Sequence, residues 1–425
     1  MKFFQLLYNI FIVPILWTVF QLGQIFNKKI RTGIIGRKHL FRELELNSKK
    51  LNGSHRFWFH ASSLGEFEQA KPIISFLKKK YPMVNIIVTF FSPSGFENSK
   101  NYKHANIISY IPFDSYSNVI RFLRIVKPDA AIMVRYDIWP NMIFALKKNS
   151  FPVMIANATM QQHSLRKLPL LLQFHQVLYD CFSHILTVSK KDEQSFRDFK
   201  TTIPLIVSIG DTRFDQVILR SEEARQKHLF ASSVVDNKKI FIVGQSWGED
   251  DDVIIPVLLK IHIVEPQLVT IIVPHEPTIE HLEELETKLE GNISFIRFSE
   301  MNNYNSEKII LIDSVGILVA LYKYAHVVYI GGSFKQGIHN VLEPAVFGNP
   351  VIYGPKHTNS QEAVELARNG GGFIVENEKE LYRTLRTLLN NNNDRIIAAN
   401  ISKAFVYDNC GATQRFLQYL EPYLN

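Results

Sequence analysis

Glu66 has the sequence context of a general base. It ends the segment His60-Ala61-Ser62-Ser63-Leu64-Gly65-Glu66, in which an apolar run gives way to a small-residue turn and then to a helical pattern. A carboxylate at that point lies at the carboxyl end of a strand, where parallel sheets bind ligands, and the start of a helix stabilises its charged form. On position alone, an ordinary first-turn glutamate is the alternative, and it is favoured over a base.

Three other polar segments follow predicted strands. Thr89–Gly95 offers hydroxyls and amides to a substrate, or serves only as a helix cap. Arg135–Asn141 places Asp137 at a strand end before a helix that opens at Pro140; an exposed loop with a packed tryptophan is the alternative. Gly210–Asp215 carries Arg213, whose planar guanidinium binds phosphate in a bidentate manner; a salt bridge between domains is the alternative.

The segment Gly331–Ala345 is the most informative. A β-branched run feeds a glycine-rich turn, and a helix is predicted from near Asn340. Free amides at that helix start can hold a phosphate, and Glu343 can accept hydrogen bonds from a ribose diol. The segment is not a GxGxxG dinucleotide fingerprint. Its H-N-x-L-E-P-A ending makes it more specific than a plain strand-to-helix connection.

These segments need parallel sheets to position them. Short apolar runs alternate with amphipathic stretches, which predicts parallel sheets covered on both faces. The predicted strands are Phe57–Ala61, Asn85–Phe91, Asn106–Ile111, Ala130–Val134, Val153–Asn157 and His184–Ser189, followed by Lys239–Gly244, Gln267–Val273, Ile309–Ile312, Val327–Ile330 and Pro350–Ile352. The charged stretch Phe214–Asp236 separates the two series, so we predict two doubly wound α/β domains that face a cleft.

The bulk composition limits the functional classes. Of 425 residues, 46% are hydrophobic and 21% are charged, which is a globular composition. Cys181 and Cys410 are too few for a disulfide framework, so a reducing compartment is expected. The net charge of +8 favours anionic partners, but no nucleic-acid-binding motif is present, and a basic surface tuned for solubility is the alternative.

The first 26 residues are largely apolar and long enough to cross a bilayer. Polar positions within them, including Gln5, Asn9 and Pro14, also suit a helix that lies in the interface. Basic residues follow at Lys28, Lys29 and beyond, which places the rest of the chain on the cytoplasmic side. A buried core helix is the alternative.

Taken together, these motifs resemble the 3-deoxy-D-manno-octulosonic acid (Kdo) transferases over essentially the whole chain. The most specific pieces are the S-x-G-E turn, the W-P-N segment, the G-x-x-[KR]-F-D stretch and the glycine block ending in L-E-P-A. The resemblance implies a GT-B fold of two Rossmann-like domains with an N-terminal membrane anchor. It also implies CMP-Kdo as the donor, a lipid A precursor (lipid IVA) as the acceptor, and the cytoplasmic side of a bacterial inner membrane as the location.

The resemblance also assigns roles to single residues. Glu66 is the expected base in an inverting transfer, and Asp137 and Arg213 are expected to stabilise the transition state. The expected CMP-binding residues are Pro274, His275, Val315, Gly316, Ile317, Asn340, Val341, Leu342 and Glu343, with Ser246 as a further phosphate contact. No cofactor or metal is expected, because basic side chains and helix amides suffice for a leaving group with one phosphate.

The expected division of the chain is residues 1–26 as a membrane anchor, 27–215 as an acceptor domain and 216–425 as a CMP-sugar donor domain. The last helix is expected to pack back on the acceptor domain.

The chain departs from the family pattern at four places. Arg135 stands where many members have glutamate, His275 where many have arginine, and Ile317 where glutamate is usual. A histidine that meets the donor makes binding pH-dependent. Trp247 interrupts a commoner G-S-T-H-x-G-E pattern and packs against either the nucleotide or the core.

Two alternative functions remain open. The chain could be another GT-B enzyme, such as a UDP-sugar transferase or a nucleotide-sugar epimerase, because these share the glycine turn and the ribose-binding glutamate. It could also be a non-catalytic membrane-surface binding protein, because a fold does not fix a function.

Overall fold

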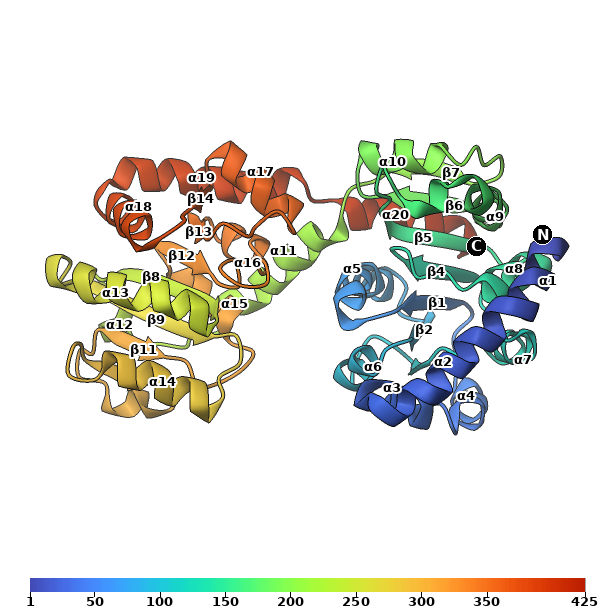
Figure 1. The fold of residues 1–425 in the computed structure, drawn as a ribbon, viewed down its shortest axis with the longest axis horizontal. Coiled ribbons are helices and arrows are strands. Elements are labelled where there is room, and N and C mark those ends of the chain that lie inside the picture. The colour runs from blue at the N-terminus through green and yellow to red at the C-terminus, as the bar shows by residue number, and fades with distance from the viewer. Residues whose placement is uncertain (425) are drawn as a thin grey trace. The chain divides into compact units, whose positions relative to one another are not determined.

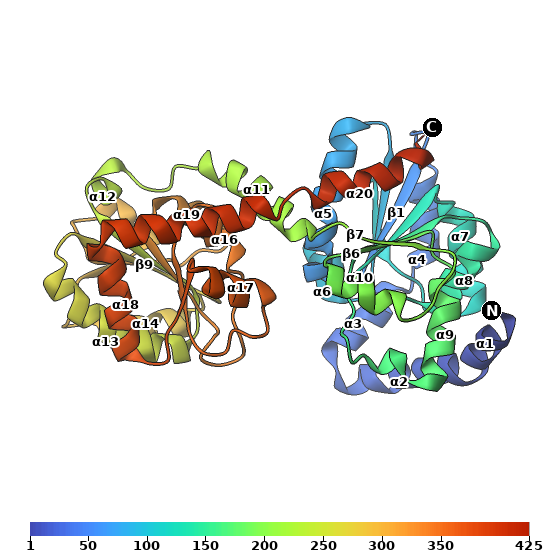
Figure 2. The same ribbon diagram turned by 90° about the horizontal axis from the view of Figure 1, so that it is seen from above.

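The computed structural model describes the backbone of residues 1–424 and their side chains except that of residue 170. The chain forms two compact units, Met1–Gln216 with Cys410–Asn425, and Val217–Asn409. Each unit is a parallel sheet with helices on both faces (Figures 1 and 2). The helix α11 (Thr212–Arg225) begins in the first unit and ends in the second.

The first unit is built on a seven-stranded parallel sheet in the order β3-β2-β1-β4-β5-β6-β7. Its strands are β1 Arg56–Ala61, β2 Asn85–Phe90, β3 Ile107–Tyr110, β4 Ala130–Val134, β5 Val153–Ala158, β6 His184–Thr187 and β7 Leu205–Ser208. The central strands are buried on both faces, as their near-continuous apolar sequences require. The chain order reverses between β1 and β4, so a ligand crevice is expected at that point.

The helices of the first unit connect and cover these strands. They are α1 Lys2–Leu7, the π-helical turn η1 Tyr8–Ile12, α2 Val13–Phe26, α3 Lys28–Gly36, α4 Leu40–Ser48, α5 Leu64–Lys80, α6 Pro93–Ser99, α7 Tyr116–Val126, α8 Pro140–Lys148, η2 Leu165–Lys167, α9 Pro169–Tyr179, α10 Lys190–Arg197, α20 Ala412–Leu420 and η5 Glu421–Tyr423. The terminal helix α20 packs on α5, where Phe416 and Leu420 share a buried cluster with Phe67. Asp215 fixes the approach to α20 by accepting hydrogen bonds from the backbone of Gly411 and Thr413.

The second unit repeats the design with the order β10-β11-β9-β8-β12-β13-β14. Its strands are β8 Lys239–Ser246, β9 Leu268–Pro274, β10 Phe295–Arg297, β11 Ile309–Leu311, β12 Val327–Ile330, β13 Val351–Tyr353 and β14 Gly372–Ile374. Its helices are α12 Ser232–Val235, α13 Gly248–Val264, α14 Ile279–Leu289, η3 Phe298–Asn303, α15 Leu318–Leu321, η4 Tyr322–Tyr324, α16 Leu342–Ala345, α17 Gln361–Asn369, α18 Glu378–Asn390 and α19 Asn392–Asp408. Here the reversal lies between β8 and β12.

The sequence located the interior strands within about two residues but missed β7, β10 and β14. All three lie at sheet edges, and Leu205 and Ile374 on two of them are exposed. The helix α5 begins at Leu64 and so contains Pro72 in its interior. Proline favours a first turn, but buried residues at helical spacing, including Phe67 and Ala70, continue the helix on its N-terminal side.

One helix is long and apolar enough to cross a membrane by length and composition, the continuous helix Lys2–Phe26. In the structure it lies along the first unit, beside α8 and α9 (Figure 2). Asn9 and Asn141 exchange side-chain hydrogen bonds of 2.9 Å, and Gln5 adds a third at 3.2 Å. The polar positions of the helix therefore face the protein, while side chains such as Phe3 and Trp17 are exposed.

Candidate active site and donor pocket

The first candidate site lies where the strand order reverses in the first unit. Glu66 sits in the first turn of α5, which directly follows β1. Asp137 follows β4, the neighbour of β1 on the other side of the reversal. Residues 71 positions apart in the sequence thus meet at one edge of the sheet. No side chain would be met by a Cβ added at Gly65, which leaves open space beside the turn.

The Glu66 carboxylate is buried, with 6% of the residue exposed. Its Oε2 accepts a hydrogen bond of 2.5 Å from the backbone of Ser62, which orients it. Burial raises the pKa of Glu66 above its ordinary value; the negative charge of Asp137 adds to the rise, while the Ser62 hydrogen bond opposes it. A carboxyl whose pKa moves toward neutrality is a stronger base, which is the change that general-base catalysis needs.

A buried chain of hydrogen bonds holds Asp137. The indole of Trp58 donates to Thr89 Oγ1 (2.8 Å), Thr89 contacts His60 Nδ1 (2.9 Å), and His60 Nε2 contacts Asp137 Oδ2 (2.8 Å). With its proton on Nε2, His60 donates to Asp137 and accepts a hydrogen bond from the Thr89 hydroxyl. Burial by itself would raise the pKa of Asp137, but the hydrogen bond from His60 and a second from Trp139 outweigh it and hold the pKa below its usual range. Asp137 therefore stays ionised beside Glu66.

Arg213 lies in the first turn of α11 and is fixed by Asp211. Its guanidinium contacts Asp211 Oδ2 at 2.7 and 2.8 Å, and Asp211 is only 4% exposed. The preceding Thr212 exchanges hydrogen bonds with buried Asn157 and donates to the backbone oxygen of Gln69 on α5. The start of α11 is therefore tied to the helix that carries Glu66. Sequence reasoning missed Asp211 and Asn157 as supporting residues.

The second candidate site lies at the reversal between β8 and β12 in the second unit. The glycine turn after β12 passes so close to β8 that a Cβ on Gly331 would lie 2.2 Å from the backbone oxygen of Gln245. Gly332 has a φ of +91°, which favours glycine. Buried Asp250 fixes this approach by accepting hydrogen bonds from the backbone of Gly332 and Trp247. The sequence pattern gave Asp250 no role.

Three rings stack at this reversal, and the middle one, His275, forms part of a cavity wall. The ring of His275 lies 4.5 Å from that of Trp247 and 4.4 Å from that of His339, with interplanar angles of 24° and 10°. The Trp247 indole donates to His339 Nε2 at 3.0 Å, so that nitrogen is unprotonated. Burial, with a smaller effect of His275, lowers the pKa of His339 to about 4. Trp247 therefore packs on the histidine that was predicted to meet the donor.

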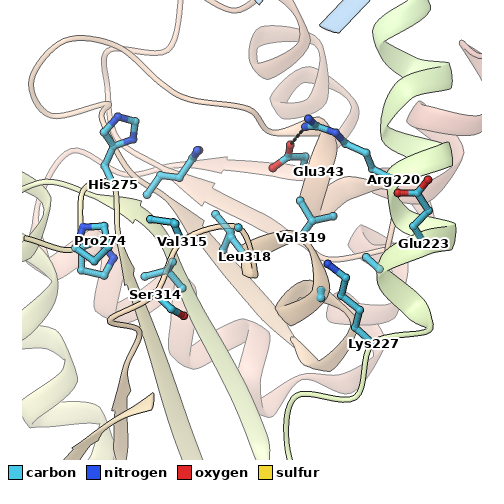
Figure 3. Close-up of a pocket in the computed structure, with 16 residues that line it drawn as sticks. Arg220, Glu223, Lys227, Pro274, His275, Ser314, Val315, Leu318, Val319 and Glu343 are labelled. Carbon is cyan, nitrogen blue, oxygen red and sulfur yellow. Dashed lines mark hydrogen bonds and ion pairs between the residues drawn. The ribbon is translucent and has the colours of Figure 1, made fainter. Parts of the chain in front are cut away.

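A cavity of about 400 Å³ opens beside this wall, within the range of small-molecule sites. Predicted donor residues line it, namely Pro274, His275, Val315, Gly316 and Glu343. Figure 3 shows Arg220 reaching from α11 toward Glu343, with a distance of 3.2 Å between Nη1 and Oε1. Lys227 lies on the same side of the cavity as Arg220. The charged stretch that contains Arg220 and Lys227 was assigned to a domain junction, which is why neither was predicted.

The other predicted donor residues lie outside this lining: Ser246, Ile317, Asn340, Val341 and Leu342. Ser246 is fully buried, and Ile317 precedes α15. Asn340 accepts a hydrogen bond of 3.0 Å from the backbone of Leu342, the first residue of the four-residue helix α16. Within residues 1–424, no group of three or more histidine, cysteine, aspartate or glutamate side chains is arranged to hold a metal ion.

Comparison with known proteins identifies relatives. Residues 36–216 match the family described as 3-Deoxy-D-manno-octulosonic-acid transferase (kdotransferase). The 3-deoxy-D-manno-octulosonic acid transferase of Haemophilus influenzae is 29% identical over 377 residues, which cover 86% of this chain and 87% of that protein. A bifunctional glycosyltransferase/methyltransferase of Fusobacterium nucleatum is 25% identical over 384 residues, 85% of this chain but only 59% of that longer protein.

Solved structures support the fold alone. The UDP-GlcNAc 2-epimerase of Neisseria meningitidis aligns with a TM-score of 0.61 at 15% identity, covering 87% of this chain and 100% of that one. The two parallel seven-stranded sheets and this likeness confirm the predicted GT-B-type α/β fold.

Proposed function

The chain belongs to the Kdo transferase family of glycosyltransferases, and we propose that it transfers Kdo from CMP-Kdo to the lipid A precursor lipid IVA with inversion of configuration. The observation that carries this proposal is the Glu66 carboxylate, which is buried at the strand-order reversal and has a raised pKa. Glu66 takes the proton of an acceptor hydroxyl, and the resulting oxygen attacks the anomeric carbon of Kdo. The bond from that carbon to the CMP phosphate breaks, and CMP departs with its electron pair.

In this proposal Asp137 and Arg213 act on the transition state. The ionised Asp137 raises the basicity of Glu66 and stabilises positive charge that develops on the sugar as the leaving group departs. Arg213, held by Asp211, counters negative charge that builds on the CMP phosphate. The tie between α11 and α5 supports this pairing because it fixes Arg213 relative to the helix that carries the base.

The cavity of the second unit is proposed to bind CMP. Glu343 would accept hydrogen bonds from the ribose diol, and His275 would face the phosphate. Because Glu343 contacts Arg220, the ribose would bind to a carboxylate whose charge is already balanced. The loop positions Val315 and Gly316 are exposed, and Gly316 has a φ of +83°, so their backbone groups are available to the nucleotide.

The acceptor is proposed to be reached from the cytoplasmic face of a bacterial inner membrane. The helix Lys2–Phe26 turns apolar side chains such as Phe11 and Trp17 outward, and Lys28 and Lys29 follow it, a pattern suited to anionic headgroups. Removal of residues 1–26 should release the protein from membrane vesicles into the soluble fraction. Persistent pelleting with the vesicles would contradict this role.

A second candidate function is a UDP-sugar enzyme, because such enzymes share the glycine turn and the ribose-binding glutamate that this sequence has at Gly331, Gly332 and Glu343. Nucleotide binding separates the two, because a ligand that binds only the folded state raises the melting temperature. CMP at about 100 times its Kd should stabilise the protein by about 2.7 kcal/mol, whereas UDP at the same concentration should give a much smaller rise. A larger rise with UDP would transfer the assignment to the second candidate.

A further inference from the structure

Two arginines of the first unit flank one exposed tyrosine. Arg135 directly follows β4, and its backbone has a φ of +63°, which is unfavourable for a residue with a side chain. Its backbone nitrogen donates to the oxygen of Ala156 at 2.8 Å, which holds this conformation. Residues with a strained backbone cluster at functional sites, and Arg135 has such a backbone at a strand end beside the proposed base. We therefore infer that Arg135 has a functional role of its own.

The two guanidinium groups share the ring of Tyr136. The Cζ atom of Arg135 lies 5.4 Å from the ring centroid, and that of Arg166, on η2, lies 6.0 Å from it. Tyr136 is 46% exposed, and both arginines are half-buried. Within residues 1–424, neither guanidinium has a carboxylate oxygen within 4.0 Å; Arg166 donates to the hydroxyl of Tyr179 at 3.4 Å. Two positive charges thus converge on one exposed ring without a carboxylate to balance them.

One arginine of the pair acts on the proposed base, and the other has apolar side chains beside it. On one side, the charge of Arg135 acts on the Glu66 carboxyl and lowers its pKa against the larger effect of burial. On the other side, Arg166 is flanked by Leu165 and Leu168, which are 73% and 51% exposed. The helix α9 that follows contacts the N-terminal helix through the rings of Phe174 and Phe4, 5.7 Å apart. A ligand with a charged headgroup and acyl chains suits this combination of basic and exposed apolar side chains.

We propose that Arg135 and Arg166 bind a phosphate group of the acceptor headgroup, with the ring of Tyr136 against its sugar. The proposal rests on the proposed function, because it takes the acceptor to be a phosphorylated glycolipid. A guanidinium binds phosphate through paired, charge-assisted hydrogen bonds, and two such groups around one aromatic ring suit a phosphorylated sugar. The exposed leucines beside Arg166 favour a lipid-borne phosphate over a free one.

The experiment compares two acceptors with the full-length protein in detergent. One is the bisphosphorylated, tetraacylated glucosamine disaccharide, and the other is the same lipid with its phosphates removed. The variants are Arg135→Gln and Arg166→Gln. Arg124→Gln is the matched control, because Arg124 is exposed on α7 of the same unit and loses the same charge. Melting temperatures of all variants show whether each is folded.

Each arginine variant should lower kcat/KM for the phosphorylated acceptor about tenfold, the size expected for one charge-assisted hydrogen bond. Arg166→Gln should leave kcat/KM for the dephosphorylated acceptor unchanged. Arg135→Gln also removes a charge that acts on Glu66, so it should change kcat/KM for the dephosphorylated acceptor, but by less than for the phosphorylated one. The KM for CMP-Kdo should be unchanged in both variants, and Arg124→Gln should behave as wild type. Equal losses with both acceptors, no loss with either, or a raised KM for CMP-Kdo would each overturn the proposal.

A binding measurement separates this proposal from the proposed reaction. The water-soluble, deacylated disaccharide bisphosphate is titrated into wild type and Arg135→Gln by calorimetry. Weaker binding by the variant supports the phosphate site even if wild type transfers no Kdo. If both proteins bind the disaccharide equally and wild type transfers Kdo normally, the proposed phosphate site is refuted and the proposed reaction stands.

Discussion

The Asp250 carboxylate tests how hydrogen bonds fix the glycine turn after β12, which we call the donor loop. The residue is fully buried on α13, and its oxygens accept three hydrogen bonds. Two come from the backbone of Gly332 (2.8 Å) and Trp247 (3.0 Å), and one comes from the hydroxyl of Tyr329 (2.8 Å). Asp250→Ala leaves all three donors without this partner. A buried donor without a partner costs about 1–3 kcal/mol, so the loss should be about 3 kcal/mol or more.

The loss should appear as a lower melting temperature of the second unit. For a domain of about this size, 1 kcal/mol shifts the melting temperature by about 2–4 °C, so Asp250→Ala should lower it by about 6–12 °C. Differential scanning calorimetry of the full chain measures it, and the transition that CMP raises is that of the second unit. CMP affinity should fall as well, because Gly332 and Trp247 are the backbone positions that Asp250 fixes.

Asp252→Ala is the matched control for this prediction. Asp252 lies two residues further along α13, but its side chain is 68% exposed and pairs with Lys288 on the surface. An exposed ion pair contributes about 0.2–1 kcal/mol, so the control should shift the melting temperature by only a few degrees at most. If the melting temperatures of Asp250→Ala and Asp252→Ala are equal, the hydrogen bonds of Asp250 do not stabilise the donor loop. If it melts lower but binds CMP normally, the loop geometry does not govern the nucleotide.

Three further predictions follow from the ionisable groups. Asp137→Asn removes a negative charge that raises the pKa of Glu66, so the acid limb of the kcat/KM profile should move to lower pH; movement to higher pH would contradict the assignment. Glu343→Ala should weaken CMP binding about tenfold in titration calorimetry, and unchanged affinity would remove Glu343 from the ribose site. Burial raises the pKa of Asp114 from 3.8 to about 7, so its contribution to folding is greatest at low pH and is lost as pH rises through 7. Wild type should gain about 1.4 kcal/mol of stability from this group between pH 8 and pH 6, and Asp114→Asn should lose that gain in urea titrations; an equal gain in both would refute the shift.

The sequence determined most of the fold because the central strands are continuous apolar runs. Ala130–Val134 and Val327–Ile330 were predicted with the bounds that the structure has. Among the edge strands, β3 was predicted, whereas β7, β10 and β14 were not; β10 and β14 have only three residues each and carry little apolar signal. The parallel α/β fold could therefore be predicted from the other strands, without β7, β10 and β14.

The site was harder to predict because its supporting residues act over long sequence distances. His60 and Asp137 are 77 positions apart, and Gly332 and Asp250 are 82 apart, so no local pattern connects them. The left-handed backbone of Arg135 has no sequence signal, because such a conformation is expected at glycine. Motif matching located Glu66 at a strand end. Its burial and its hydrogen bond from Ser62 required coordinates.

The most direct test of the central claim is Kdo transfer by wild type and Glu66→Gln side by side. Freshly generated CMP-Kdo and lipid IVA are the substrates, and Glu68→Gln is the control, because Glu68 lies two residues away on α5 and pairs with Lys71. The account predicts product from wild type and Glu68→Gln, a loss of about 10²–10⁴-fold in kcat for Glu66→Gln, and unchanged CMP binding in all three. Full turnover by Glu66→Gln, or no product from a wild type that binds CMP, would contradict it.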